Sequence, residues 1–186
     1  MTEIIDLELT AMTHGGSALG RHDGRPFFVP SGIPGERVLV RVTQDKRSYA
    51  FAEIVDVIRE SPERTAPRCF HFGVCGGCHW QHIDYAAQLR FKRDVVVEQM
   101  ARIGGLRDAV VHSTIASPDP WFYRSHATFH VASAGRLGFV GSDDRTVIPL
   151  DECHIIRPEL GEWLDALRSE HFKRGERVRL QIGASG

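Results

Sequence analysis

The sequence predicts a β-rich α+β protein, in which a small five-stranded barrel of the OB type precedes a small α+β domain. Three observations support this fold class. Residues 1–59 contain short apolar segments separated by glycine turns, residues 84–103 have the spacing of one long helix, and residues 110–156 are again β-rich. We therefore expect a barrel domain over residues 1–59 and an α+β domain over residues 60–186.

The five barrel strands are predicted from alternating apolar residues and from the turns between them. Apolar side chains alternate from Ile5 onward in the first segment, and His22-Asp23-Gly24 marks a tight turn between the second and third. A unit this short buries only about 60% of its unfolded surface and is marginally stable alone. The predicted strands are Ile4–Leu9, Ala18–Arg21, Pro26–Val29, Val38–Val42 and Phe51–Ile58.

The remaining elements follow a proline-containing linker, Glu60–Arg68. Asp84 is a suitable N-cap for the long helix, and Gly104-Gly105 would end it. Its apolar residues at helical spacing are Leu89, Val96, Met100 and Ile103. Further strands are expected over 127–131, 137–140, 147–150 and 177–182, with a helix that begins at Pro158. Because the last strand lies just before Gly186, we expect the chain to be the first part of a longer protein.

Composition excludes some classes of protein. The net charge is −1, so a nucleic-acid interface would have to come from local basic patches. No stretch approaches the roughly 18 apolar residues of a membrane span, and the acidic, alternating N-terminus does not resemble a signal peptide. We therefore expect a cytoplasmic protein without a membrane partner. In that reducing compartment, clustered cysteines bind metals more often than they form disulfides.

The chain has four cysteines, and three of them share one short loop. Cys69, Cys75 and Cys78 lie within ten residues, and Cys153 follows far downstream. Closely spaced thiolates on an irregular loop, completed by a distant fourth, are typical of an iron–sulfur cluster. Gly76-Gly77 would let the backbone wrap tightly around such a group.

Two other interpretations of the cysteines remain open at this point. Zinc could be bound by the Cys75/Cys78 pair with help from nearby histidines, of which the candidates are His71, His79 and His82. Alternatively, the thiols could be unligated and simply packed, because free cysteine behaves as a small buried hydrophobe. Taken alone, Cys153 is a packing residue more often than a ligand.

The run Cys69–His82 resembles the iron–sulfur loop of the RNA uracil-5-methyltransferases. The match includes Gly76-Gly77 and Gln81-His82 as well as the cysteine spacing. The segment before it is similar to a TRAM domain, an OB-like RNA-binding barrel, through Gly15, Gly20 and Pro34-Gly35-Glu36. Further matches to the central domain of that family are Tyr123-Arg124, Leu137-Gly138-Phe139 and Asp151-Glu152-Cys153-His154-Ile155.

This resemblance implies a function and a ligand set. It implies an RNA-recognition portion of an enzyme that methylates ribosomal or transfer RNA with S-adenosylmethionine, and a 4Fe–4S cluster held by Cys69, Cys75, Cys78 and Cys153. The family's nucleophilic cysteine, its carboxylate base and its S-adenosylmethionine loop match nothing in these 186 residues. We therefore expect no catalytic residue here, S-adenosylmethionine only in a full-length member, and no methylation by this chain alone. No protein partner is implied.

Basic and aromatic residues at loop tips predict where RNA would bind. Cations contact phosphates and rings stack on unpaired bases. The candidates are Arg21, Arg25, Lys46, Arg47, Tyr49 and Phe51 in the barrel, and Arg124 by the family resemblance. Ordinary solvated turns are the plain alternative for the barrel residues, and an arginine that seals a domain interface is the alternative for Arg124.

Other functions compete with the methyltransferase hypothesis. They are a stand-alone zinc module that binds nucleic acid, a radical RNA-modifying enzyme with one open iron, and an electron carrier. A radical enzyme needs only three cysteine ligands, so the role of Cys153 separates it from a closed four-thiolate cluster.

Overall fold

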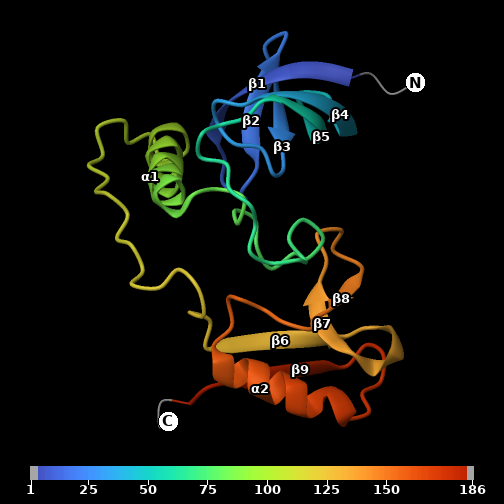
Figure 1. Cartoon of the computed structure of the whole chain (residues 1–186). Helices are drawn as coiled ribbons and strands as arrows, with labels where there is room; N and C mark the ends of the chain where they lie inside the picture. The colour runs from blue at the N-terminus through green and yellow to red at the C-terminus, as the bar shows by residue number, and fades with distance from the viewer. Residues whose placement is uncertain (1–3, 184–186) are drawn as a thin grey trace. The chain divides into compact units, whose positions relative to one another are not determined.

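The computed structural model describes residues 4–183 and divides the chain into two compact units. Residues 1–66 and 79–115 form the barrel unit, and residues 67–78 and 116–186 form the sheet unit. Both are drawn in Figure 1. These units divide the chain differently from the expected domains, 1–59 and 60–186, because residues 60–66 and 79–115 group with the barrel. We describe each unit by itself.

A closed five-stranded barrel forms the first unit, as the sequence predicts (Figure 1). The strand order is β1-β2-β3-β5-β4, and only β3 and β5 pair in parallel. The strands are β1 (Ile4–Met12), β2 (Ala18–His22), β3 (Arg25–Val29), β4 (Arg37–Lys46) and β5 (Tyr49–Arg59). The β2–β3 hairpin turns at Asp23 and Gly24, whose φ angles of 50° and 77° are the left-handed values that such tight turns require.

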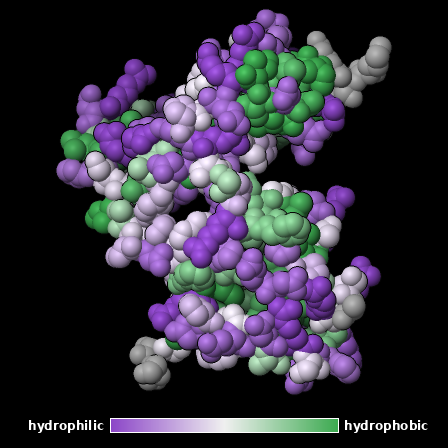
Figure 2. Space-filling view, viewed as in Figure 1, coloured by the Kyte–Doolittle hydropathy of each residue, from purple (hydrophilic) through white to green (hydrophobic). Residues whose placement is uncertain are grey.

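Alternation along the strands builds the barrel core. Residues of β1 alternate between exposed and buried from Ile4 to Leu9, as expected when one face of a strand points inward. Leu7, Val38 and Val40 are at most 1% exposed at the centre of this core. The large apolar side chains that the strands leave exposed include Ile4, Val55 and Ile58, and Figure 2 shows a hydrophobic patch on the visible face of the barrel.

The long helix α1 (Tyr85–Arg102) begins as predicted. The Asp84 carboxylate accepts hydrogen bonds from the backbone N–H groups of Ala86 and Ala87, which confirms it as the N-cap. The buried face, however, is not the one that the apolar pattern suggests. Ala87 is buried, and Phe91 and Val95 pack against the barrel core with it.

The residues that were expected to form the apolar face of α1 are largely exposed instead. Val96 is 43% exposed, Met100 41% and Ile103 79%. A helix turns about 100° per residue, so positions 87, 91 and 95 form one stripe and positions 96, 100 and 103 form another. Both stripes are apolar, and the sequence alone does not say which of them the barrel covers.

The second unit is a four-stranded antiparallel sheet with the order β8-β7-β6-β9. Its strands are β6 (His126–Val131), β7 (Leu137–Val140), β8 (Val147–Pro149) and β9 (Arg177–Gln181). The helix α2 (Pro158–Ala166) lies across β9 and β6 in Figure 1, with Pro158 in its first turn. Two short 3-10 turns, η1 (Ser133–Gly135) and η2 (Leu167–Ser169), complete the unit. The strands and this helix agree with the sequence prediction to within about one residue.

The core of the sheet unit lies between α2 and the sheet. Phe129 and Leu160 are fully buried, and the rings of Phe129 and Phe139 stack with their centroids 5.1 Å apart. Leu164 extends the contact along α2. Over residues 4–183, no helix is long and apolar enough to cross a membrane.

Candidate metal centre and nucleic-acid surface

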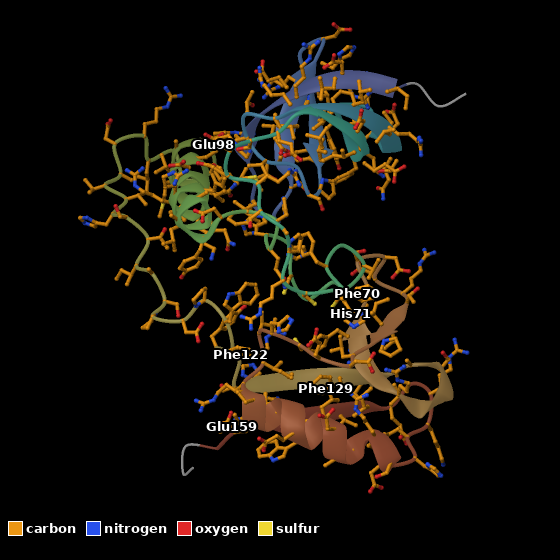
Figure 3. All side chains as sticks on the ribbon, in the orientation of Figure 1. Phe70, His71, Glu98, Phe122, Phe129 and Glu159 are labelled. Atoms are coloured by element: carbon orange, nitrogen blue, oxygen red, sulfur yellow. The ribbon has the colours of Figure 1, made fainter. Side chains whose placement is uncertain are left out.

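Residues 69–78, here called the cysteine loop, are attached to the sheet unit beside β7. The backbone N–H of Gly76 donates to the carbonyl of Val140 at 3.0 Å, and Ser142 donates to the carbonyl of Val74 at 2.9 Å. Phe70 and His71, labelled in Figure 3, lie on this loop. The loop is therefore held by the end of a strand and not only by its own turns.

Glycine is required in the loop for steric reasons. A Cβ added at Gly76 would lie 2.8 Å from the carbonyl oxygen of Val140, which is a backbone atom that cannot move aside easily. The next glycine, Gly77, donates its N–H to the Cys75 sulfur at 3.4 Å. The Gly76-Gly77 pair thus allows a close approach to β7 and supplies a hydrogen bond to one of the thiols.

Three of the four thiols lie within electrostatic range of one another. Burial raises the pKa of both Cys75 and Cys153. The negative charge of Cys69 raises both pKa values further, and that of Cys153 also raises the pKa of Cys75. The nearby Arg124 guanidinium opposes this effect at both cysteines. Cys75 and Cys153 also pack against the same apolar core of the sheet unit, so the fold brings the distant Cys153 near the cysteine loop.

The fourth thiol, Cys78, lies at the end of the same loop. Partial burial of the Tyr123 hydroxyl raises its pKa, although the residue as a whole is 60% exposed, and the charges of Cys78 and Cys153 raise it further. All four cysteines are half-buried and belong to the sheet unit.

The donor set suits a group that binds thiolates. Cys153 accepts hydrogen bonds from the backbone N–H groups of Ile155 and Ile156, which favour its charged form as the Gly77 N–H does at Cys75. Such N–H groups and the cation Arg124 would stabilise thiolates that a bound metal or cluster requires. In the described part of the chain, no three His, Cys, Asp or Glu side chains are arranged to hold a single metal ion.

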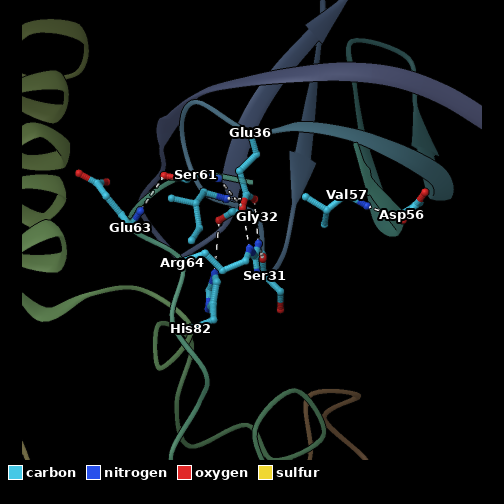
Figure 4. A network of polar contacts seen from close by, with 10 residues as sticks. Ser31, Gly32, Glu36, Asp56, Val57, Ser61, Glu63, Arg64 and His82 are labelled. Carbon is cyan, nitrogen blue, oxygen red and sulfur yellow. Dashed lines mark hydrogen bonds and ion pairs between the residues drawn. The ribbon is translucent and has the colours of Figure 1, made fainter. Parts of the chain in front are cut away.

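Two of the three histidines considered as zinc ligands, His79 and His82, belong to the barrel unit. His82 is 2% exposed, and its ring nitrogen Nε2 lies 3.5 Å from the carbonyl oxygen of Gly32. Burial, and then the positive charge of Arg64, lower the pKa of His82 to about 4. His82 therefore contributes to a buried polar network with Glu36 and Arg64, shown in Figure 4.

Three aromatic rings gather on the outside of the barrel near the β4–β5 turn. The ring centroids of Phe28, Tyr49 and Phe51 lie 5.5–5.7 Å from one another, and all three side chains are half-buried. Tyr49 and Phe51 were predicted from sequence, whereas Phe28 was missed. Its neighbour Phe27 points into the core at 3% exposure, so alternation along β3 would have placed Phe28 outside.

The predicted cations of the barrel differ in their availability. Arg25 donates to the carboxylate of Asp45 and to the carbonyls of Lys46 and Tyr49. This pairing holds the pKa of Asp45 below its usual range. Arg25 therefore braces the β4–β5 turn.

The other three barrel cations are exposed, but they are not equivalent. Arg21 donates to the carbonyl of Gly24 within its own hairpin at 3.0 Å. Lys46 and Arg47 are exposed at the β4–β5 turn, beside the aromatic rings. These two are the cations best placed to meet a phosphate next to a stacked base.

Arg124 belongs to the sheet unit, whereas the other RNA-contact candidates belong to the barrel unit. Its guanidinium carbon is 5.9 Å from the centroid of the Phe139 ring, and its backbone N–H donates to the carbonyl of Ile155 at 2.8 Å. Because its charge acts on Cys75 and Cys153, Arg124 belongs to the surroundings of the cysteines.

Comparison with known proteins identifies the barrel and gives relatives for most of the chain. Residues 3–55 match the TRAM domain model. The chain is 36% identical over 170 residues to the 23S rRNA (uracil(1939)-C(5))-methyltransferase RlmD of Alkalilimnicola ehrlichii. The aligned region covers 89% of this chain and 38% of that protein. RlmD of Methylococcus capsulatus is 34% identical over 169 residues, with coverage of 88% and 38%.

A solved structure shares the fold. The crystal structure of Pyrococcus abyssi tRNA (uracil-54, C5)-methyltransferase in complex with S-adenosyl-L-homocysteine matches with a TM-score of 0.58 and 24% identity, over 87% of this chain and 35% of that one. The chain thus spans little more than a third of the length of these relatives. It carries a TRAM domain and corresponds to the N-terminal portion of the RNA uracil-5-methyltransferase family that these relatives represent.

Proposed function

We propose that this chain is the RNA-recognition and iron–sulfur portion of an S-adenosylmethionine-dependent RNA (uracil-5-)methyltransferase that acts on ribosomal or transfer RNA. The observation that carries the proposal is that the distant Cys153 belongs to the same unit as the three loop cysteines and packs against the same apolar core as Cys75. The relatives named above are RNA uracil methyltransferases, and the solved one binds S-adenosyl-L-homocysteine. Both facts agree with this assignment.

In this proposal, Cys69, Cys75, Cys78 and Cys153 hold a 4Fe–4S cluster. When bound, such a group would supply a rigid anionic centre that joins the cysteine loop to the segment around Cys153. Four thiolates leave no iron open for substrate, so the role would be to position RNA-binding surfaces. Binding must release thiol protons, because the thiolate is the form that binds a metal and burial raises the pKa of Cys75 and Cys153.

Spectroscopy separates the cluster from zinc, the second candidate. Protein purified without oxygen should be brown, with a broad absorption band that reduction bleaches and with iron and sulfide bound to it. A colourless protein with one zinc per chain would overturn the cluster and leave a zinc-containing nucleic-acid-binding module as the function.

The RNA surface of the barrel is proposed to be the aromatic group Phe28, Tyr49 and Phe51 with the exposed Lys46 and Arg47. A base stacked on an aromatic ring contributes about 1–3 kcal/mol to binding.

The domains are proposed as an RNA-binding barrel over 1–59 and a cluster-binding portion over 60–186. We also propose that these 186 residues do not methylate RNA by themselves, since no residue here matches the family's catalytic positions.

Anisotropy titration of a labelled uridine-containing RNA hairpin with the whole chain tests this surface. Phe51→Ala should weaken binding by about fivefold or more at fixed salt. The double variant Lys46→Gln/Arg47→Gln should make the fall of log K with log salt less steep, by up to about 1.4. This figure assumes roughly 0.7 per lost phosphate contact on a single strand. The matched control is Arg107→Gln, an exposed cation elsewhere in the barrel unit. Equal slopes for the double variant and the control would contradict the proposed surface.

A further inference from the structure

A cation that stacks on two aromatic rings borders the cysteine loop. Arg68 immediately precedes Cys69, and its guanidinium carbon lies 5.3 Å from the centroid of the Trp121 ring and 5.3 Å from that of Phe122. All three residues belong to the sheet unit. A guanidinium held over two ring faces gains from the quadrupoles of both, and its planar shape suits stacking.

The same two rings contact the residue that follows Cys153. The ring of His154 lies edge-on to Trp121 and Phe122, with centroids 6.3 Å and 6.4 Å apart. The backbone N–H of Phe122 donates to the carbonyl of His154 at 3.0 Å. Residues 121 and 122 therefore contact both the residue before Cys69 and the residue after Cys153.

The backbone at this junction is held in an uncommon conformation. Phe122 has a φ of +52°, which side chains other than glycine rarely adopt. Such a conformation persists where surrounding contacts over-determine it. Here those contacts are the hydrogen bond to His154 and the stacking with Arg68; Figure 3 labels Phe122 near the start of β6.

We propose that Arg68, Trp121 and Phe122 form a clamp that places Cys69 beside Cys153 before any metal binds. The two cysteines are separated by 84 positions (153 − 69), so a flexible chain would rarely bring them together. A preformed pair removes that entropic barrier from the assembly of the site. Arg68 is thus a positioning residue, which acts through the backbone next to each thiol.

The clamp would serve the cluster of the proposed function, and to that extent it rests on that function. Its existence, however, is a property of the metal-free protein. The test is therefore made on the whole chain without metal, under reducing and then anaerobic conditions. Cys75→Ser and Cys78→Ser leave Cys69 and Cys153 as the only thiols. A short bifunctional thiol reagent, dibromobimane, then reports how often the two sulfurs are close, and monobromobimane reports the reactivity of each thiol by itself.

Arg68→Met should lower the ratio of cross-linking to single labelling by about fivefold or more, because two cation–π contacts are lost. Arg68→Lys keeps the charge without the planar stack and should give an intermediate ratio. Trp121→Leu should lower the ratio as Arg68→Met does. The matched control is Arg174→Met, an exposed arginine of the same unit outside the clamp. An unchanged ratio in Arg68→Met and Trp121→Leu, with circular dichroism equal to that of the parent, would overturn the clamp.

A second measurement separates failure of the clamp from failure of the proposed function. With all four cysteines present, uptake of sulfide and of iron supplied as equal parts of Fe²⁺ and Fe³⁺ by the metal-free chain should be several-fold slower in Arg68→Met and should reach the same final iron content. Equal uptake rates would contradict the clamp. If no variant, including the parent, takes up iron, the proposed cluster is wrong, and the cross-linking ratio still decides whether the clamp exists.

Discussion

Replacement of Glu36 by glutamine tests the account of the barrel most quantitatively. Glu36 is fully buried, and its carboxylate accepts hydrogen bonds from the Arg64 guanidinium at 2.6 Å and 2.8 Å. It also accepts from the backbone N–H groups of Ile33 at 2.9 Å and Ser61 at 3.3 Å (Figure 4). Glutamine has no negative charge, and one of its two side-chain polar atoms is an NH₂ group instead of an oxygen. That group would face N–H donors of Arg64 and the backbone and could not accept a hydrogen bond from them.

The magnitude follows from the burial of the two partners. Removal of one partner from a buried ion pair destabilises a protein by about 3–5 kcal/mol, because the other charge stays buried and uncompensated. The Arg64 side chain keeps 21% of its surface exposed and also donates to the carbonyl of Ser31, so the lower end of that range applies. We expect Glu36→Gln to lower the unfolding free energy of the barrel unit by about 3 kcal/mol.

Hydrogen exchange measured by mass spectrometry on peptides from β1 and β4 is the suitable assay, because it reports the barrel unit separately. A loss of about 3 kcal/mol should speed exchange of the core amides by roughly a hundredfold. The control is Glu53→Gln, whose partner is Arg41 at 3.0 Å with both side chains about half exposed, and which should cost less than about 1 kcal/mol. The reasoning is refuted if the two variants exchange at similar rates.

Two further predictions concern pH and packing. The pKa of His82 is about 4 in the folded chain against 6.5 as its ordinary value, so its contribution to stability is fully present above pH 6.5 and is lost as pH falls through about 4. Urea unfolding followed by circular dichroism measures the unfolding free energy at each pH. Between pH 7.5 and pH 5, the parent should lose about 2 kcal/mol more of this free energy than His82→Gln does. Identical pH profiles of the two proteins would contradict this account. Gly138→Ala should destabilise the sheet unit by at least about 2 kcal/mol, because the new Cβ would clash with the backbone carbonyl oxygen of Ile148 in β8. Gly161→Ala, in open space on α2, should be neutral or stabilising by up to about 1 kcal/mol in the same assay, and an equal loss in both variants would show that the close approach is not the cause.

Local patterns were sufficient to predict the secondary structure. Alternation of apolar residues along β1, the turn at Asp23-Gly24 and the N-cap at Asp84 depend on neighbouring residues, and the structure confirms each of them. The five-stranded barrel followed from the same patterns.

Features that depend on contacts between distant residues could not be predicted in the same way. Helix α1 has two apolar stripes, and only packing selects the one that contains Ala87 and Phe91. The chain also returns to the barrel after the cysteine loop, so that Trp80 donates from its indole N–H to the carbonyl of Gly16. Trp80 therefore packs against the core of the barrel unit.

The candidate site was predicted in part. The spacing of Cys69, Cys75 and Cys78 pointed to a thiolate site, but the inclusion of Cys153 depended on resemblance to a family. The structure adds the electrostatic coupling among the thiols and the stacking of Arg68 on Trp121, neither of which has a signal in local sequence. The roles of the cysteines and of the RNA-contact residues stay predictions.

Iron and acid-labile sulfide measured per chain, in protein purified without oxygen, test the central claim most directly. The account predicts four iron and four sulfide per chain in the parent. It predicts a marked loss of both, and of thermal stability in the sheet unit, in Cys153→Ser. A parent without iron would contradict the account, and so would a Cys153→Ser variant that keeps its full iron content and stability.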